Sequence, residues 1–433
     1  MFDRYDAGEI AVLVHIDFHG DMNQNDVDEF EQLVYSANLK SKGLIHSNRK
    51  KPHSKYFVGT GKAEEIAQMV KDVGAEVVIF NHSLTPAQER DLEKLCQCRV
   101  FDRTTLILDI FAQRARTHEG KLQVELAQLK HLSTRLVRGW THLERQKGGI
   151  GLRGPGEKQL ETDKRLLSQR IKAIERRLAK VEKQRVQTRR SRTRSDVPTV
   201  ALVGYTNAGK STLFNKMTES HVYVQDQLFA TLDPTLRKID LTETQRCILA
   251  DTVGFIRHLP HDLVVSFKAT LQETQEADLL LHVVDCSDPH MCENMDTVQD
   301  VLTQLGAQDL PCLVVYNKID LIEGGQAHTE YNDQGIPEKI WTSAKRLEDL
   351  EQVKHAILRK LAIKTLVFHL KVPSQQGRYL GLLFDHTDIM SHEFDEQGQC
   401  LLHIEVSHIN WQRLLKETNR ELEQFVYFSD TMS

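Results

Sequence analysis

The chain of 433 residues lacks any apolar run approaching the roughly 20 residues that a membrane-spanning helix needs. Its first six residues have neither the basic region nor the apolar core of a signal peptide. The seven cysteines are odd in number and scattered, which excludes a disulfide framework and indicates reduced thiols. With 10 prolines and 23 glycines, collagen-like and low-complexity chains are excluded as well. We therefore expect a cytoplasmic protein without stable membrane insertion, long enough for about three domains.

Metal-binding patterns are also scarce. Cys96 and Cys98 have no second cysteine pair nearby, so their spacing does not predict a zinc site. None of the 20 histidines forms an H-E-x-x-H motif. His15 and His19 are four residues apart on or just past a predicted strand, where side chains lie about 13 Å apart. We expect no zinc site.

The net charge of −5 hides a strong asymmetry along the chain. Residues 111–196 hold 23 Lys or Arg against 9 Asp or Glu, an excess of +14, so the remainder carries −19. Such a basic stretch inside an acidic protein favours a polyanion-binding element, and nucleic acid is the polyanion we expect. The alternative is a solvated helical surface.

The hydrophobic pattern divides the chain into four parts. Alternating patterns predict an α/β subdomain over 1–110, with strands at 9–18, 56–58 and 76–80 and helices at 26–39 and 63–73. For residues 111–196 we predict a helical hairpin, with helices at 112–145 and 158–187. A basic glycine-rich loop at 148–156 joins the helices, and a polar linker follows at 189–194. Residues 197–362 predict one doubly wound α/β domain. Residues 363–433 predict a small α+β domain with strands at 366–372, 386–394 and 400–406 and a last helix at 410–423.

The third part contains a phosphate-binding loop. The pattern G-x-x-x-x-G-K-S stands between a predicted strand and a predicted helix, as such a loop requires. Glycines let backbone N–H groups turn toward phosphates, and the helix N-terminus adds positive potential. We expect Lys210 to reach the β- and γ-phosphates and Ser211 to ligate Mg²⁺. The loop consists of Gly204, Tyr205, Thr206, Asn207, Ala208, Gly209, Lys210 and Ser211.

Three further short motifs follow in order, each at the end of a predicted strand. In the first, Asp251 suits a second Mg²⁺ position and the Gly254 N–H can touch the γ-phosphate. In the second, Asp320 can accept two hydrogen bonds from guanine, a pattern that adenine does not offer. In the third, a backbone N–H can meet guanine O6. Together with the phosphate loop they predict a guanine-nucleotide-binding domain; the elements are Asp251-Thr252-Val253-Gly254, Asn317-Lys318-Ile319-Asp320 and Ser343-Ala344-Lys345.

The segment between the phosphate loop and Asp251 contains the expected switch threonine. We predict that Thr231 ligates Mg²⁺ with its hydroxyl and meets the γ-phosphate with its amide; Thr235, after Pro234, is the alternative. The surrounding residues are assigned to nucleotide binding with it: Phe229, Ala230, Leu232 and Asp233.

Motifs inside and outside the nucleotide domain resemble the HflX branch of the translation-factor-related GTPases. The similarity covers about residues 10–365 and is most specific in the stretches 102–116, 123–129 and 148–157. It implies a GTPase that binds GTP and GDP, associates with the large (50S) ribosomal subunit, and acts in ribosome splitting, rescue or biogenesis. It also implies that the hairpin is directed at ribosomal RNA. We expect a monomer.

The residue that should orient the attacking water is missing. In Ras-like enzymes a glutamine follows the Asp-x-x-Gly element, but this chain has Phe255 there. Hydrolysis should therefore be slow without a partner, with Lys210, Thr231 and Gly254 as the catalytic groups of the chain itself. Asn207 resembles the potassium-coordinating asparagine of several translation-linked GTPases, so K⁺ is a second expected ion; the alternative is that Asn207 only stabilises its loop.

Other interpretations of the sequence stay open. A different class of function is an RNA-binding ribosome-assembly module in which GTP only gates docking. The segment 59–63 resembles half a phosphate loop, although a helix cap fits it better, so a second nucleotide site stays open. Trp140 either stacks on an RNA base or packs between helices.

Overall fold

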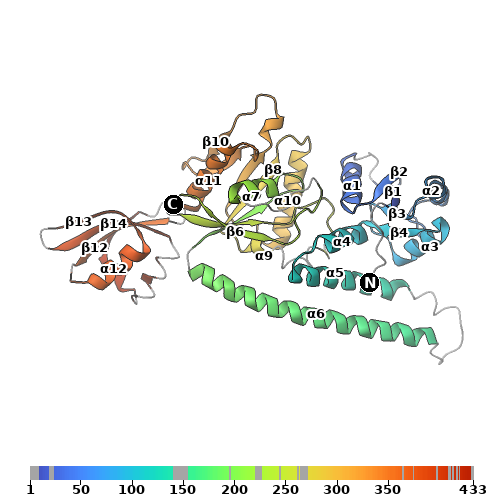
Figure 1. Ribbon diagram of the computed structural model, residues 1–433, viewed down its shortest axis with the longest axis horizontal. Helices are drawn as coiled ribbons and strands as arrows, with labels where there is room; N and C mark the ends of the chain where they lie inside the picture. The colour runs from blue at the N-terminus through green and yellow to red at the C-terminus, as the bar shows by residue number, and fades with distance from the viewer. Residues whose placement is uncertain are drawn as a thin grey trace.

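The computed structural model describes residues 9–18, 24–139, 155–194, 197–219, 227–242, 245–260, 263, 272–362, 365–373, 375–395, 398–407, 411, 414–415, 418 and 420–430. Three β-sheets follow one another along the long axis, and a long helix runs beside the first two (Figure 1). Among the described helices, none has both the length and the apolar character needed to cross a membrane.

The first sheet is wholly parallel, with the strand order β2-β1-β3-β4. Its strands alternate with helices because each parallel connection needs a crossover. In chain order the elements are β1 (Ile10–Asp17), α1 (Gln24–Ser36), β2 (Lys40–Asn48), α2 (Thr60–Val73), β3 (Val77–Phe80), α3 (Pro86–Cys96), β4 (Arg99–Asp102) and α4 (Arg103–Arg114).

One prediction for this region is wrong, and the strands β2 and β4 were not predicted. Residues 56–58 form isolated bridges and no strand, because Phe57 has a left-handed backbone with φ of 65°. The sheet instead contains β2, which the hydrophobic pattern did not reveal, since an edge strand with largely polar, exposed residues carries no alternating signal.

The helical hairpin consists of α5 (His118–Gly139) and α6 (Pro155–Arg194), which pack through buried leucine and isoleucine side chains. The first predicted helix, 112–145, is divided: α4 ends at Arg114 because Ala115 is extended, and α5 starts afterwards. The predicted linker at 189–194 is the last turn and a half of α6; arginine favours helix, so no apolar stripe is needed there. The interface residues are Leu122, Leu126, Leu129, Ile171, Ile174 and Leu178.

The second sheet has seven strands in the order β10-β11-β9-β8-β5-β7-β6, parallel except for β6 and β10. Two apolar clusters cover its faces, one of which it shares with the first domain. Its elements are β5 (Thr199–Val203), α7 (Lys210–Thr218), β6 (Thr235–Asp240), β7 (Arg246–Asp251), α9 (Gln272–Gln275), β8 (Leu279–Asp285), α10 (Met291–Leu305), β9 (Cys312–Asn317), η1 (Ile319–Leu321), β10 (His328–Tyr331), β11 (Pro337–Trp341) and α11 (Leu347–Ala362).

The third sheet is antiparallel, in the order β13-β14-β12-β15, and has its own core around Leu370, Ile404 and Leu422. The predicted last helix, 410–423, is wrong at its end. Arg420 has a left-handed backbone, so a 3₁₀ turn and an unpredicted strand follow it. The elements are β12 (Thr365–Pro373), α12 (Gly377–His386), β13 (Asp388–Phe394), β14 (Gln399–Ser407), η2 (Glu421–Phe425) and β15 (Val426–Asp430).

The first two domains share one apolar cluster. Phe111 of α4 packs edge-on against Phe229 of the second domain, with ring centroids 4.7 Å apart. Phe30 of α1 and Phe255 are fully buried in the same cluster. The two domains therefore form one packed unit around the nucleotide-binding motifs.

Candidate functional site

The loop between β5 and α7 has the conformation that a phosphate requires. Gly204 has φ of 149°, and a Cβ there would lie 2.2 Å from the Val283 carbonyl oxygen. Gly209 has φ of 95°, and its Cβ would meet Asn317 Nδ2 at 2.2 Å. Both positions therefore need glycine because of backbone angle and space.

Lys210, the first residue of α7, is buried inside this loop. Its Nζ donates to the carbonyl oxygens of Gly204 at 3.0 Å and Tyr205 at 2.6 Å. Burial lowers the pKa of Lys210 to about 8. A phosphate group beside the ammonium would favour its charged form, so the geometry suits an anionic ligand.

Three side-chain oxygens converge at the start of α7. Ser211 Oγ lies 2.9 Å from Thr231 Oγ1 and 2.8 Å from Asp251 Oδ2, and Thr231 Oγ1 lies 3.0 Å from that same carboxylate oxygen. Asp251 is fully buried, burial raises its pKa, and its Oδ1 has no hydrogen-bond partner among the described residues. Hard oxygen donors are what Mg²⁺ prefers, so these residues fit that ion. Bound there, Mg²⁺ would neutralise phosphate charge.

The segment after Asp251 lies against the phosphate loop. A Cβ on Gly254 would come within 2.8 Å of Thr206 Cγ2 and 3.1 Å of Lys210 Nζ. The backbone of Phe255 exchanges hydrogen bonds with Gly204 and Thr206, at 3.2 and 2.8 Å. The Phe255 ring is only 1% exposed, so the side chain that follows the Asp-x-x-Gly element belongs to the core and cannot hold a water.

The base end is assembled at the ends of β9 and β11. The Asn317 amide donates to the Ala208 carbonyl and accepts from the Ala344 N–H, both at 2.9 Å, which joins this end to the phosphate loop. Asp320 accepts from Ser343 Oγ at 2.6 Å and from Lys345 Nζ at 3.2 Å. The Ser343 hydrogen bond, with the Lys345 charge, lowers the pKa of Asp320, so its carboxylate is kept as an acceptor.

These elements line one cavity of about 360 Å³. Most of the residues assigned from sequence line it: Thr206, Asn207, Gly209, Lys210, Ser211, Phe229, Ala230, Thr231, Thr252, Gly254, Asn317, Lys318, Asp320, Ser343, Ala344 and Lys345. The other assigned residues of these motifs do not line the cavity but lie next to residues that do. They are Gly204, Tyr205, Ala208, Asp251, Val253 and Ile319. The lining also includes residues that sequence reasoning missed, because they stand outside the motifs: Thr212, Gln227 and Leu321.

Two further assigned residues belong to other parts of the structure. Leu232 is 2% exposed and belongs to the shared apolar cluster. The Asp233 carboxylate accepts hydrogen bonds from the start of α5, at Arg116 and Thr117. Neither residue lines the cavity, and both anchor the loop that carries Thr231; their assignment to nucleotide binding stays a prediction.

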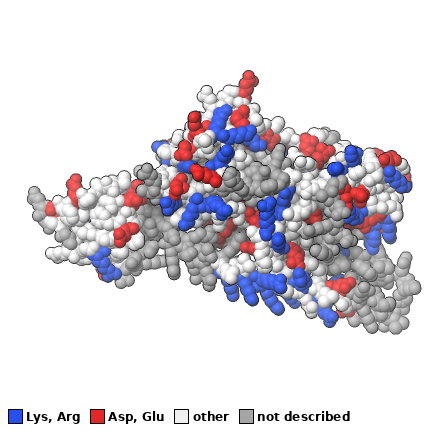
Figure 2. All heavy atoms as spheres, in the orientation of Figure 1, with Lys and Arg blue, Asp and Glu red and all other residues white. Residues whose placement is uncertain are grey.

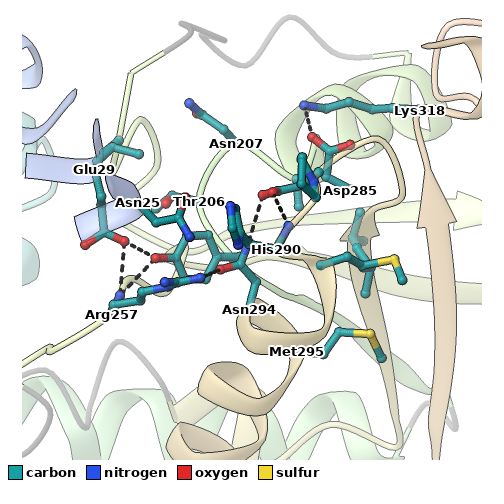
Figure 3. A pocket seen from close by; sticks show the side chains of 18 of the residues that line it. Asn25, Glu29, Thr206, Asn207, Arg257, Asp285, His290, Asn294, Met295 and Lys318 are labelled. Carbon is teal, nitrogen blue, oxygen red and sulfur yellow. Dashed lines mark hydrogen bonds and ion pairs between the residues drawn. The ribbon is translucent and has the colours of Figure 1, made fainter. Parts of the chain in front are cut away.

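A second cavity of about 480 Å³ lies where α1 meets the phosphate loop and α10 (Figure 3). Glu29 of α1 accepts a hydrogen bond from the Tyr205 hydroxyl and pairs with Arg103. The Arg257 N–H lies 3.1 Å from the Tyr205 hydroxyl and 3.3 Å from Glu29 Oε2. Asn207 lines both cavities and has a left-handed backbone with φ of 61°. The Glu29 carboxylate of the first domain thus contacts both the phosphate loop, at Tyr205, and the segment after Gly254, at Arg257.

The remaining candidates from the sequence have ordinary surroundings or lie outside the described residues. Gly59 is the N-cap of α2, which begins at Thr60. His15 bonds to Asp17 and Asn81, and no group of metal-ligating side chains occurs in the described residues. His19, Trp140 and the loop 148–154 lie in the ranges that the structure does not describe.

The basic character of the hairpin gathers on α6. Lys and Arg side chains follow the outer edge of this helix (Figure 2). Glu125 and Glu175 pair with cations across the two helices, but the exposed acids between 161 and 184 are few. The exposed cations are Lys164, Arg165, Arg170, Lys172, Arg176, Arg177, Lys180 and Lys183.

Three family models match successive parts of the chain. Residues 24–112 match the family described as GTP-binding GTPase N-terminal, 114–192 the GTP-binding GTPase Middle Region, and 199–318 the 50S ribosome-binding GTPase. A solved structure described as the SsGBP and GDP complex has a TM-score of 0.47 and 24% identity, covering 81% of this chain and 97% of that one.

Two relatives are both described as GTPase HflX. That of Escherichia coli (strain K12) is 58% identical over 417 residues, which are 96% of this chain and 98% of the relative. That of Caldanaerobacter subterraneus is 45% identical over 390 residues, which are 90% of this chain and 89% of the relative. Identity at this level across nearly the whole length confirms the resemblance found in the sequence motifs. The chain belongs to the HflX family of GTPases and hydrolyses GTP.

Proposed function

We propose that this GTPase binds the large ribosomal subunit through the hairpin of α5 and α6 and hydrolyses GTP there, in splitting or rescuing ribosomes. The observation that carries the proposal is the row of exposed cations on α6, beside a domain whose family is described as 50S ribosome-binding. Phosphate contacts by Lys and Arg supply most of the affinity for RNA. Monomeric protein is expected to be the active form.

In the proposed catalytic site, Lys210 holds the β- and γ-phosphates, and Ser211, Thr231 and Asp251 hold Mg²⁺. Support comes from the convergence of their oxygens and from the buried ammonium beside them. Asp320 selects guanine, and the Gly254 N–H meets the γ-phosphate. Phe255 supplies no water-orienting group, so contact with the ribosomal particle completes the site.

We include K⁺ in the proposal as an ion held beside Asn207. Asn207 lines the cavity and has a left-handed backbone with φ of 61°. A monovalent cation between the β- and γ-phosphates would stabilise charge that develops during hydrolysis. Its effect should disappear in Asn207→Ala.

The test is GTP turnover and particle binding, with K⁺ or Na⁺, with and without large subunits. We expect strong stimulation by large subunits, and a GTP-dependent shift of intact ribosomes to subunits in sucrose gradients. Neutralising Lys172, Arg176 and Lys180 together should weaken particle binding. It should also lower the slope of log K against log salt by about 0.7 to 0.9 for each RNA phosphate that is no longer neutralised.

Neutralising the exposed acids Glu161 and Asp163 serves as the control on the same helix. Equal turnover with and without large subunits would favour the alternative, an assembly module in which GTP only gates docking. Unchanged particle affinity after loss of the three cations would contradict the hairpin as the binding element. Equal rates in K⁺ and Na⁺ would remove the potassium part.

A further inference from the structure

The loop that carries Thr231 is fastened to the first domain and the hairpin along its length. At its start, the Leu228 N–H donates to Ser36 Oγ at the end of α1, at 2.9 Å. Next, Phe229 packs on Phe111 of α4. At its end, Asp233 reaches the start of α5. Thr231 is thus placed by groups outside the nucleotide-binding domain.

The contact at Asp233 is a shared helix cap. Its Oδ2 accepts from the backbone N–H groups of Arg116 and Thr117, both at 2.8 Å, and its Oδ1 accepts from Thr117 Oγ1 at 2.6 Å. Thr117 Oγ1 in turn accepts from the Gly120 N–H at 2.9 Å, which makes Thr117 the N-cap of α5. A carboxylate at a helix N-terminus also gains from the helix dipole. The loop therefore ends in a charged cap of the hairpin's first helix.

Gly120 provides the space for this cap. A Cβ at this position would lie 2.0 Å from Asp233 Oδ1 and 3.0 Å from its Cγ. No rotation of so short a side chain keeps all three hydrogen bonds and clears that overlap. The cap therefore requires aspartate on one element and glycine on the other.

Asp233, which caps α5, is close in sequence to Thr231, which contacts the proposed Mg²⁺ ligands. Thr231, which bonds to Ser211 and Asp251, is two residues before Asp233, and the buried Leu232 holds the residue between them in the core. On the other side, α5 packs against α6 through Leu122, Leu126 and Ile174. A shift of α5 is thus passed to Thr231 through one carboxylate.

We propose that Asp233 is a positioning residue for GTP hydrolysis, which couples the helical hairpin to the switch threonine. It does not touch the nucleotide; it fixes Thr231 relative to Ser211 and Asp251 according to the position of α5. The part of this inference that concerns stimulation by large subunits rests on the proposed function. The coupling itself is a property of the free protein.

Two variants break the cap from opposite sides. Asp233→Ala removes the carboxylate that accepts all three hydrogen bonds, whereas asparagine could keep them by placing its amide oxygen on the two backbone N–H groups. Gly120→Ala displaces the carboxylate while raising the intrinsic helix propensity of α5, so a loss of coupling cannot come from a weakened helix. Gly61→Ala is the matched control, because Gly61 lies in the first turn of α2 and a Cβ added there would meet no atom within 4 Å.

The first measurement is steady-state GTP turnover of the full-length protein with saturating large subunits. We expect Asp233→Ala and Gly120→Ala to lose about tenfold in stimulated kcat, since a small misplacement of a catalytic group by a distant substitution can cost up to about 100-fold in rate. The KM for GTP, the affinity for the particle and the turnover of Gly61→Ala should stay at wild-type values. Wild-type stimulation in both cap variants would overturn the inference while leaving the proposed function intact.

The second measurement needs no ribosomes. Coupling is reciprocal, so the nucleotide should act on α5 as α5 acts on Thr231. Hydrogen exchange of residues 116–122 should differ between GDP and a non-hydrolysable GTP analogue in the wild type and in Gly61→Ala, and the difference should vanish in both cap variants. Identical exchange in the two wild-type states would overturn the inference, even if large subunits stimulate hydrolysis.

Discussion

The two ends of the nucleotide site are built in different ways. At the base end, Asp320, Ser343 and Asn317 bond only to one another and to neighbouring residues of the same domain in the described structure. At the phosphate end, Tyr205 and the loop around Thr231 depend on the first domain and the hairpin. The base end is therefore complete within its own domain, whereas the phosphate end is shared.

This difference separates two properties of the enzyme. We expect base selectivity to depend on contacts within the nucleotide-binding domain alone. We expect the rates of hydrolysis and of nucleotide release to depend on the groups that the other domains hold. Such a division would let a large partner change the rate of hydrolysis without altering which nucleotide is bound.

The largest effect should come from changing the base end alone. Asp320→Asn replaces an acceptor by a donor facing guanine, so two hydrogen bonds to a charged group are lost, each worth about 1.5–3 kcal/mol. We expect GTP affinity to fall by about 100-fold or more and xanthosine triphosphate affinity to rise, measured by fluorescence titration. Asp333→Asn, on an exposed turn, is the control. Wild-type GTP affinity in Asp320→Asn would refute the assignment of Asp320.

A smaller effect should come from cutting the contact between the domains at the phosphate loop. Tyr205→Phe removes only the hydroxyl that joins Glu29 to the Arg257 backbone. Because one such hydrogen bond contributes about 1 kcal/mol, GDP release should quicken by about three- to tenfold in stopped-flow fluorescence.

The matched control for this change is Tyr35→Phe, an exposed tyrosine on the same helix as Glu29. Selectivity for guanine over xanthine should not move in either variant. A Tyr205→Phe protein with altered base selectivity would show that the two ends of the site are not separate.

The last effect concerns stability in acid and not nucleotide binding, and both domains should respond to it alike. Burial lowers the pKa of His82 in the first domain and of His282 in the second to about 4. The unfolded chain takes up these protons near pH 6.5 and the folded chain only near pH 4, so stability is lost as pH falls through that window. Each histidine can contribute about 3 kcal/mol to this loss at most.

Calorimetry at about pH 7 and about pH 5, on either side of the unfolded-state histidine pKa, measures the effect as a lower unfolding temperature in acid. His82→Gln should remove part of the shift, since its amide oxygen reaches the position of the imidazole Nε2 and can accept from the Ile16 N–H that now bonds His82 Nε2. Stability that is constant across this range would contradict the neutral, buried state of both histidines.

The motifs within the nucleotide-binding domain could be predicted from the sequence, whereas the contacts that other domains make with the phosphate end could not. Residues 204–211 and 317–320 are short segments whose geometry depends on glycines and strand ends within them, so their positions could be predicted. Glu29 is one acid among several on an amphipathic helix, 176 residues from the tyrosine it contacts, and nothing local marks it. Asp233 is assigned to the nucleotide by sequence because its neighbours are, and only the fold brings α5 to it.

The prediction of helices and strands failed where the hydrophobic pattern of the sequence shows no regular spacing of apolar residues. The edge strand β2 has mostly polar residues, and the last turns of α6 have no apolar stripe. The end of α4 and the 3₁₀ turn after Arg420 depend on single backbone angles that composition does not set.

The long helix α6 has one more consequence. With a rise of about 1.5 Å per residue, its 40 residues make a rod about 60 Å long, and β5, the strand that leads into the phosphate loop, starts five residues after its end. Its partner α5 leads to Thr231 through Asp233. The two helices of the hairpin are thus connected to two different segments of the phosphate site: α6 to the phosphate loop through β5, and α5 to the Thr231 loop through Asp233. Sliding one helix along the other by a single residue would displace these two connections relative to each other by about 1.5 Å.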